Sequence, residues 1–209
     1  MSKKNKWKII DVILTALIGV VFGVVYFGVG LPWNLFTSLA TPVALFLTGH
    51  SLASSLASSL VAAQVTNGAT KGLFLMAGPL AAMIIKKPGS ALFANLIASV
   101  VEIAIGSAWG TMDIIWGLVQ GLGMELGFLL VAYKKPVIGL WLSTLTGTII
   151  SFAFQYFQRS YGRFDQTYVV ILFFIWLISI MLFSGLLNLI IYKLLKKSKV
   201  DKITVIKFF

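Results

Sequence analysis

Long apolar segments separated by short polar turns run along most of this 209-residue chain. In a bilayer every backbone N–H and C=O group must be bonded within the protein, so helices are the expected form of each crossing. The pattern predicts an all-α polytopic membrane protein, a single domain over residues 1–209. The expected transmembrane helices are six, at about residues 9–30, 70–86, 89–107, 110–133, 136–158 and 167–192.

Residues 31–70 do not fit this pattern. The apolar stretch at 35–47 is interrupted by Pro42, and the stretch at 51–60 repeats Leu every fourth residue with Ser on the other faces. A single crossing here would reverse the first helix relative to all later ones. The region is therefore expected to cross the membrane either not at all or twice, as a re-entrant pair. We interpret residues 31–70 as a long extracellular loop that acts as a lid, with His50 as an ordinary loop residue.

The charge distribution favours membrane insertion over nucleic-acid binding. The net charge is +11 and the mean hydropathy is +0.98. Fourteen of the seventeen Lys and Arg residues lie in four stretches beside apolar segments, as topology determinants do. These stretches are residues 3–8, 86–87, 134–135 and 193–209. These stretches predict a plasma-membrane protein with cytoplasmic N- and C-termini and a basic tail at 193–209 that contacts lipid. Lys71, Arg159 and Arg163 are then expected on the outer side.

The first apolar segment is expected to be a retained span rather than a cleaved signal. Val12–Val29 is uncharged and longer than a signal core, and no convincing cleavage site follows it. Ala16, Gly19 and Gly23 form a ridge of small residues that allows another helix to approach closely. The ridge predicts either packing within the chain or a docking face for a partner subunit.

Three acidic residues lie inside apolar spans: Glu102, Asp113 and Glu125. The two spans that hold them contain no Lys or Arg. An ionised carboxylate in hydrocarbon costs at least ~2.5–3.5 kcal/mol, so such residues face a protein interior or a wet cavity. The chain has no cysteine, which excludes disulfides and thiolate metal sites.

Polar and aromatic residues in three neighbouring helices recur at helical spacing and so gather on single faces. If the outer ends of these helices meet, they form a pocket for a cationic or N–H-rich ligand, because indole faces attract cations and carboxylates accept hydrogen bonds. The predicted ligand-binding residues are Asn95, Glu102, Trp109, Asp113, Trp116, Gln120, Glu125, Gln155 and Tyr156.

Several of these residues also have a structural explanation. Trp109 is equally typical of an interfacial anchor, and Asp113 of a helix cap. Asn95 and Gln120 are suited to hydrogen bonds between helices. Glu125 lies in the inner half of its span, where a structural or partner-linked role is the simpler interpretation.

The segments IIKKPGSAL, SVVEIAIG and IIWGLVQGLGMELGF resemble the YkoE family of substrate-binding S-components of energy-coupling-factor (ECF) transporters. The resemblance implies six helices that bind thiamine or its hydroxymethylpyrimidine precursor, with Glu102, Gln120 and Glu125 at motif positions. It also implies coupling to a transmembrane scaffold subunit and two cytoplasmic ATPases. The chain has no Walker motif, so we expect no cofactor of its own and ATP use by the partners only.

Two other functions share part of this evidence. A stand-alone permease for a cation or a metal such as cobalt would use buried acids, but the chain lacks His and Cys ligand clusters. An intramembrane enzyme is disfavoured because no zinc-protease motif occurs and only one histidine is present. We therefore expect no catalytic residues and no metal site.

Overall fold

The structure is a computed structural model that describes residues 6–48, 55–107 and 109–198. All regular elements in these ranges are helical, which confirms the predicted fold class. The main helices are α1 (Ile9–Gly30), α2 (Trp33–Thr48), α3 (Ser55–Thr70), α4 (Ala77–Ile85), α5 (Ser90–Ile105), α6 (Met112–Leu130), α7 (Pro136–Gln158), α8 (Gln166–Ser179) and α9 (Asn188–Lys197). Shorter turns are η3 (Leu73–Leu75) and η4 (Tyr161–Arg163), and a π-helical segment, η5 (Ile180–Leu187), joins α8 to α9.

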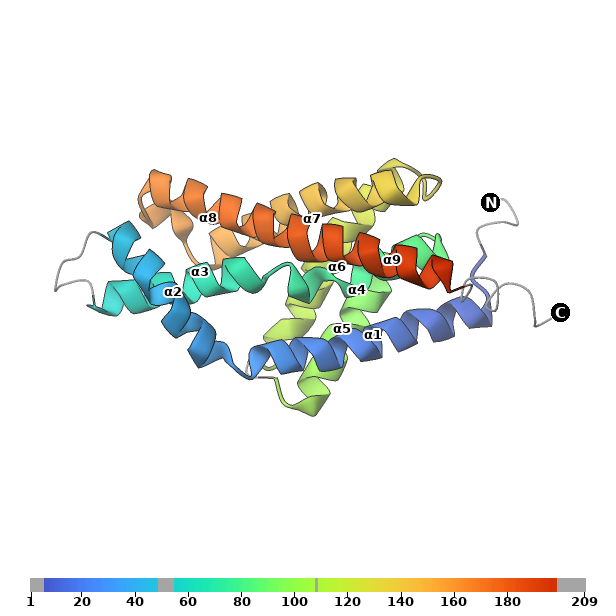
Figure 1. Cartoon of the computed structure of the whole chain (residues 1–209), viewed down its shortest axis with the longest axis horizontal. Coiled ribbons are helices and arrows are strands. Elements are labelled where there is room, and N and C mark those ends of the chain that lie inside the picture. The colour runs from blue at the N-terminus through green and yellow to red at the C-terminus, as the bar shows by residue number, and fades with distance from the viewer. Residues whose placement is uncertain (1–5, 49–54, 108, 199–209) are drawn as a thin grey trace.

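The start of α1 and the end of α9 lie at the same end of the molecule, beside the α4–α5 and α6–α7 turns (Figure 1). Side chains join the start of α1 to the α4–α5 turn: Lys87 pairs with Asp11, and the Trp7 indole donates to the Pro88 carbonyl at 3.1 Å. The described basic stretches are therefore gathered at one end of the bundle. The lysines at 3, 4 and in 199–209 lie outside the described residues.

By length and composition, the described residues contain four helices able to cross a membrane: α1, α6, α7 and the continuous helix Gln166–Lys197. A fifth candidate is the pair Ser59–Thr70 and Leu73–Ile85, which is bent by 44°. The helix α5 is apolar but has only 16 residues. These lengths support a polytopic membrane protein without establishing the predicted number of six spans.

The expected long loop over residues 31–70 is corrected by the structure, which places α2 and α3 in this region. Helix α3 buries Val61, Ala62 and Val65 in the core. At Gly68 a Cβ atom would lie 2.8 Å from the Trp176 ring, so this small residue lets α3 pack tightly on α8. Small residues such as Ala62 and Gly68 thus allow α3 to pack closely on its neighbours, where a loop was expected. His50 lies outside the described residues.

The backbone between α3 and α4 is held by polar side chains of the last long helix. The Ser179 hydroxyl accepts from the Gly72 N–H at 3.0 Å and donates to the Ala69 carbonyl at 2.7 Å. Ser184 donates to Leu75 O at 3.1 Å, and Asn188 donates to the next carbonyl, that of Met76, at 2.9 Å. These bonds give partners to backbone groups beside the break, and the Met76 carbonyl also accepts from the Leu80 N–H of α4.

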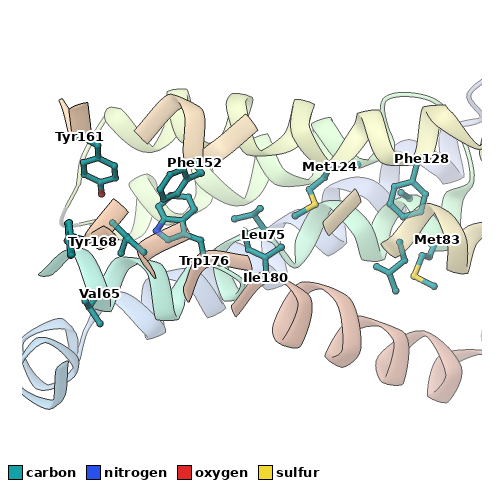
Figure 2. Packing of buried hydrophobic residues seen from close by; sticks show 14 of the residues in the cluster. Val65, Leu75, Met83, Met124, Phe128, Phe152, Tyr161, Tyr168, Trp176 and Ile180 are labelled. Carbon is teal, nitrogen blue, oxygen red and sulfur yellow. The ribbon is translucent and has the colours of Figure 1, made fainter. Parts of the chain in front are cut away.

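The largest buried cluster runs through the bundle between α3, α4, α6, α7 and α8. Figure 2 shows aromatic side chains at one end of this cluster, with Trp176 beside Phe152, and Phe128 and Met83 at the other end. The rings of Trp176 and Phe152 meet edge to face, with centroids 5.5 Å apart. The aromatic end of this core provides a rigid wall beside the site described below.

The small-residue ridge of α1 packs within the chain. A Cβ atom at Gly23 would lie 2.6 Å from Val101 Cβ and 2.7 Å from the Ala98 carbonyl, and Gly19 is similarly close to Ile97. Both glycines are buried against α5, and Ala16 is half-buried one turn away. The structure therefore favours packing over a partner-docking face at Gly19 and Gly23, and we correct the docking prediction accordingly.

Replacing Gly23 with Leu is expected to lower the apparent melting temperature in detergent by roughly 5 °C or more, because the added side chain separates α1 from α5. Gly28→Leu provides the matched control on the same helix, since a Cβ atom at Gly28 meets nothing within 4 Å. Equal melting temperatures for the two variants would contradict the packing assignment.

Candidate ligand-binding site

A cavity of about 360 Å³ is lined by residues of α5, α6, η3 and the end of α7, together with single residues of α1, α2 and α3. Six of the nine predicted ligand-binding residues line it: Glu102, Trp109, Asp113, Trp116, Gln120 and Gln155. The other lining residues are Tyr26, Trp33, Asn67, Lys71, Phe74, Ser99, Met112, Gln158 and Arg159. The cavity therefore gathers side chains from segments that are far apart in the sequence.

Glu102 presents an unused acceptor in this cavity. Its side chain is only 3% exposed, and its Oε1 atom has no hydrogen-bond partner among the described residues. Gln155 similarly leaves Oε1 unpartnered, while its Nε2 donates to the Tyr161 hydroxyl at 3.3 Å. Buried acceptors are normally satisfied, so two such atoms beside one cavity indicate a ligand with N–H or O–H donors.

Asp113 is already engaged within the protein. Its carboxylate accepts from the Ser107 hydroxyl, and the same hydroxyl oxygen accepts from the Trp109 N–H at 3.1 Å. Asp113 lies in the first turn of α6, where the helix dipole stabilises a negative charge. This arrangement orders the α5–α6 turn and leaves Glu102 as the carboxylate with a free oxygen.

Aromatic rings form two parts of the cavity wall. Trp109 meets Trp33 and Phe74 edge to face, with centroids 5.2 and 5.7 Å apart. Trp116 meets Phe154 edge to face at 4.9 Å and lies 6.4 Å from Trp176. Because neighbouring rings hold them from the side, these tryptophans have fixed orientations and are suited to stack on a flat ligand.

Asn95 supports the cavity from behind rather than lining it. It is fully buried, accepts from the Tyr26 hydroxyl at 3.2 Å and donates to Gln120 Oε1 at 3.4 Å. Tyr26 in turn accepts from the Ala77 N–H at the start of α4. Asn95 therefore positions two lining side chains and connects α1, α5 and α6.

Glu125 lies away from the cavity, at the other end of α6. Its carboxylate accepts from the backbone N–H groups of Gly89, Ala91 and Leu92 at 2.7–3.4 Å, and from the Tyr133 hydroxyl. Burial and the nearby Glu125 charge raise the pKa of Tyr133, so its phenol stays protonated and donates. A negative charge at the first N–H groups of α5 is favourable, which gives Glu125 a structural role in this turn.

Tyr156 is half-buried and also does not line the cavity. Its ring packs edge to face on Phe157 and Tyr161, with centroids 5.6 and 6.2 Å apart. The hydroxyl of Tyr161 accepts from Gln155, which lines the cavity. Tyr156 therefore supports the lining indirectly, through Tyr161.

Lys71 and Arg159 change the expected charge of the site. The sequence predicts both on the outer side and a pocket without basic groups, but both line the cavity. Lys71 is only 6% exposed, because the break after α3 turns it inward. A sequence signal existed: Lys71 is the single charged residue between positions 48 and 85. A lone charge in so apolar a region is expected to face a cavity or a partner.

Comparisons with known proteins agree with this architecture. A family model described as "ABC-type cobalt transport system, permease component" matches residues 10–150. A Bacillus subtilis (strain 168) protein, provisionally named HMP/thiamine permease protein YkoE, is 33% identical over 187 residues, which are 88% of this chain and 82% of that protein. The chain belongs to the YkoE family.

A solved structure, the crystal structure of an S-component of an ECF transporter, matches this S-component with a TM-score of 0.73 and 29% sequence identity. The match covers 94% of this chain and 89% of the other. One relative is named a permease and the other an S-component of a transporter, so the chain is a transport protein and not an enzyme. The part of the chain that the structure describes contains no group of three or more His, Cys, Asp or Glu side chains able to hold a metal ion.

Proposed function

We propose that this S-component is the high-affinity substrate-binding subunit of an ECF-type vitamin importer, and that it captures thiamine or its hydroxymethylpyrimidine precursor in the cavity. The observation that carries the proposal is the buried Glu102 carboxylate, which faces the cavity with an unpartnered oxygen. The names of the relatives support the substrate class, since one is described as an HMP/thiamine permease.

The chemistry of an aminopyrimidine suits the lining. Its amino group donates hydrogen bonds, for which Glu102 Oε1 and Gln155 Oε1 are free acceptors. Its flat ring has a stacking partner in Trp116. The volume of about 360 Å³ lies within the range of small-molecule pockets, roughly 300–1,000 Å³.

We further infer that the cavity opens toward the outer leaflet. The lining residues come from the α5–α6 turn and the end of α7, whereas the basic turns lie at the start of α5 and of α7. If the basic ends are cytoplasmic, as the positive-inside rule predicts, the cavity lies on the extracellular side. Both termini are then cytoplasmic in the plasma membrane.

Transport through this subunit requires partners. The sequence has no nucleotide-binding motif, so a transmembrane scaffold subunit and two ATPases would supply ATP hydrolysis, as the S-component family implies. Because Gly19 and Gly23 are buried against α5, we expect the scaffold to contact other residues of this chain.

Calorimetry of the purified full-length protein tests the proposal. We expect roughly equimolar, tight binding of thiamine or hydroxymethylpyrimidine, and no binding of riboflavin, which lacks the amino group that would donate to Glu102 and Gln155. A parallel titration with cobalt tests the alternative function of a metal permease. Saturable cobalt binding without binding of either pyrimidine compound would overturn the proposed function.

A further inference from the structure

The ammonium group of Lys71 lies in the cavity against the faces of two indole rings, which attract a positive charge. Its Nζ atom lies 4.2 Å from the centre of the Trp116 ring and 4.8 Å from that of Trp176. Buried lysines normally pair with a carboxylate. In the described residues, however, Lys71 makes no salt bridge and no hydrogen bond through its side chain. The two tryptophans are its immediate partners.

The charges around this ammonium balance. The carboxylates of Asp113 on α6 and Glu102 on α5 attract Lys71, and Arg159, at the end of α7, adds a second positive charge to the lining. Among the described lining residues, two formal negative charges therefore face two formal positive charges. A cavity with this composition gives a cationic ligand much less stabilisation than a purely acidic one.

We propose that Lys71 is a specificity-determining residue that lowers the affinity of the cavity for a permanently cationic ligand relative to an uncharged aminopyrimidine. This inference rests on the proposed function. When the pyrimidine ring of thiamine stacks on Trp116, its thiazolium ring lies in the same cavity as the Lys71 ammonium, and this nearby like charge costs binding free energy. An uncharged pyrimidine displaces the ammonium from the Trp116 face as well, but it adds no like charge, and its ring nitrogens can then accept a hydrogen bond from Lys71.

The test measures the ratio of the dissociation constants for thiamine and hydroxymethylpyrimidine by calorimetry on full-length protein. Lys71→Met keeps most of the apolar stem and removes the charge. We expect the thiamine-to-precursor ratio to fall by at least about tenfold in this variant, mainly because thiamine binds more tightly. Lys71→Arg keeps both the charge and the ring contact and should leave the ratio within about threefold of the original.

Lys134→Met is the matched control, because it removes the same charge from an exposed position in the α6–α7 turn, outside the cavity. An unchanged ratio in folded Lys71→Met overturns the inference, and so does a proportional loss of affinity for both ligands. Lys71→Gln repeats the measurement if the Met variant does not fold. Failure of both ligands to bind the unmodified protein overturns the proposed function, and this inference with it, so the two failures are distinguishable.

Discussion

Glu102→Gln is expected to weaken binding of the preferred pyrimidine ligand by about 10- to 100-fold. The substitution keeps the shape of the side chain but replaces a charged acceptor with a neutral one. Hydrogen bonds to charged groups contribute about 1.5–3 kcal/mol, more than those between neutral groups. Glu102 is the lining carboxylate whose oxygen has no partner within the described protein, so the ligand is expected to supply that partner. Calorimetry on the purified variant measures the change.

The same variant should be at least as stable as the original protein when no ligand is present. A buried carboxylate with an unsatisfied oxygen costs free energy, and the amide removes the charge. Asp165→Asn is the control: Asp165 lies outside the cavity and caps α8 by accepting from Thr167 and Tyr168, and Asn caps equally well. Unchanged affinity in Glu102→Gln would remove Glu102 from the binding site.

Gly127→Ala is expected to produce the largest loss of stability. A Cβ atom at Gly127 would lie 2.1 Å from the backbone nitrogen of Ser143 and 2.2 Å from its Cα atom. These are backbone atoms of α7, so no side-chain rotation relieves the overlap and α6 must move away from α7. Alanine gains about 1 kcal/mol in helix propensity over glycine, but overpacking of about 3 kcal/mol or more exceeds this gain.

Apparent melting temperatures in detergent test this prediction. We expect a decrease of roughly 5–10 °C for Gly127→Ala. The control is Gly28→Ala, an identical substitution at an exposed helical position where the new Cβ atom contacts nothing. It should leave the melting temperature unchanged or slightly raised. A melting temperature for Gly127→Ala equal to that of the control would show that the α6–α7 contact is looser than described.

Much of the cavity could be predicted from the sequence because the apolar environment restricts where polar residues can be. Glu102, Trp116 and Gln120 stand out in apolar helices, and their helical spacing places them on inward faces. Spans with a continuous apolar pattern were likewise predicted closely: the structure has helices at Ile9–Gly30 and Pro136–Gln158, as the sequence indicated.

The rest depends on contacts between distant parts of the chain. Helix α3 ends next to Lys71 because Ser179 and Ser184, more than 100 residues later, bind the backbone of the break. No local pattern reveals where the break lies, although the isolation of Lys71 in an apolar region indicates that its charge faces a cavity or a partner. Glu125 was grouped with the ligand-binding residues because it is a buried acid, whereas its partners are N–H groups 33–36 residues earlier.

The most direct test of the account is a crystal structure of the full-length protein with hydroxymethylpyrimidine or thiamine bound. The account predicts the pyrimidine ring stacked on Trp116, with its amino group within hydrogen-bond distance of the Glu102 carboxylate. A ligand bound outside this cavity, or within it but without contact to Glu102, would contradict the account.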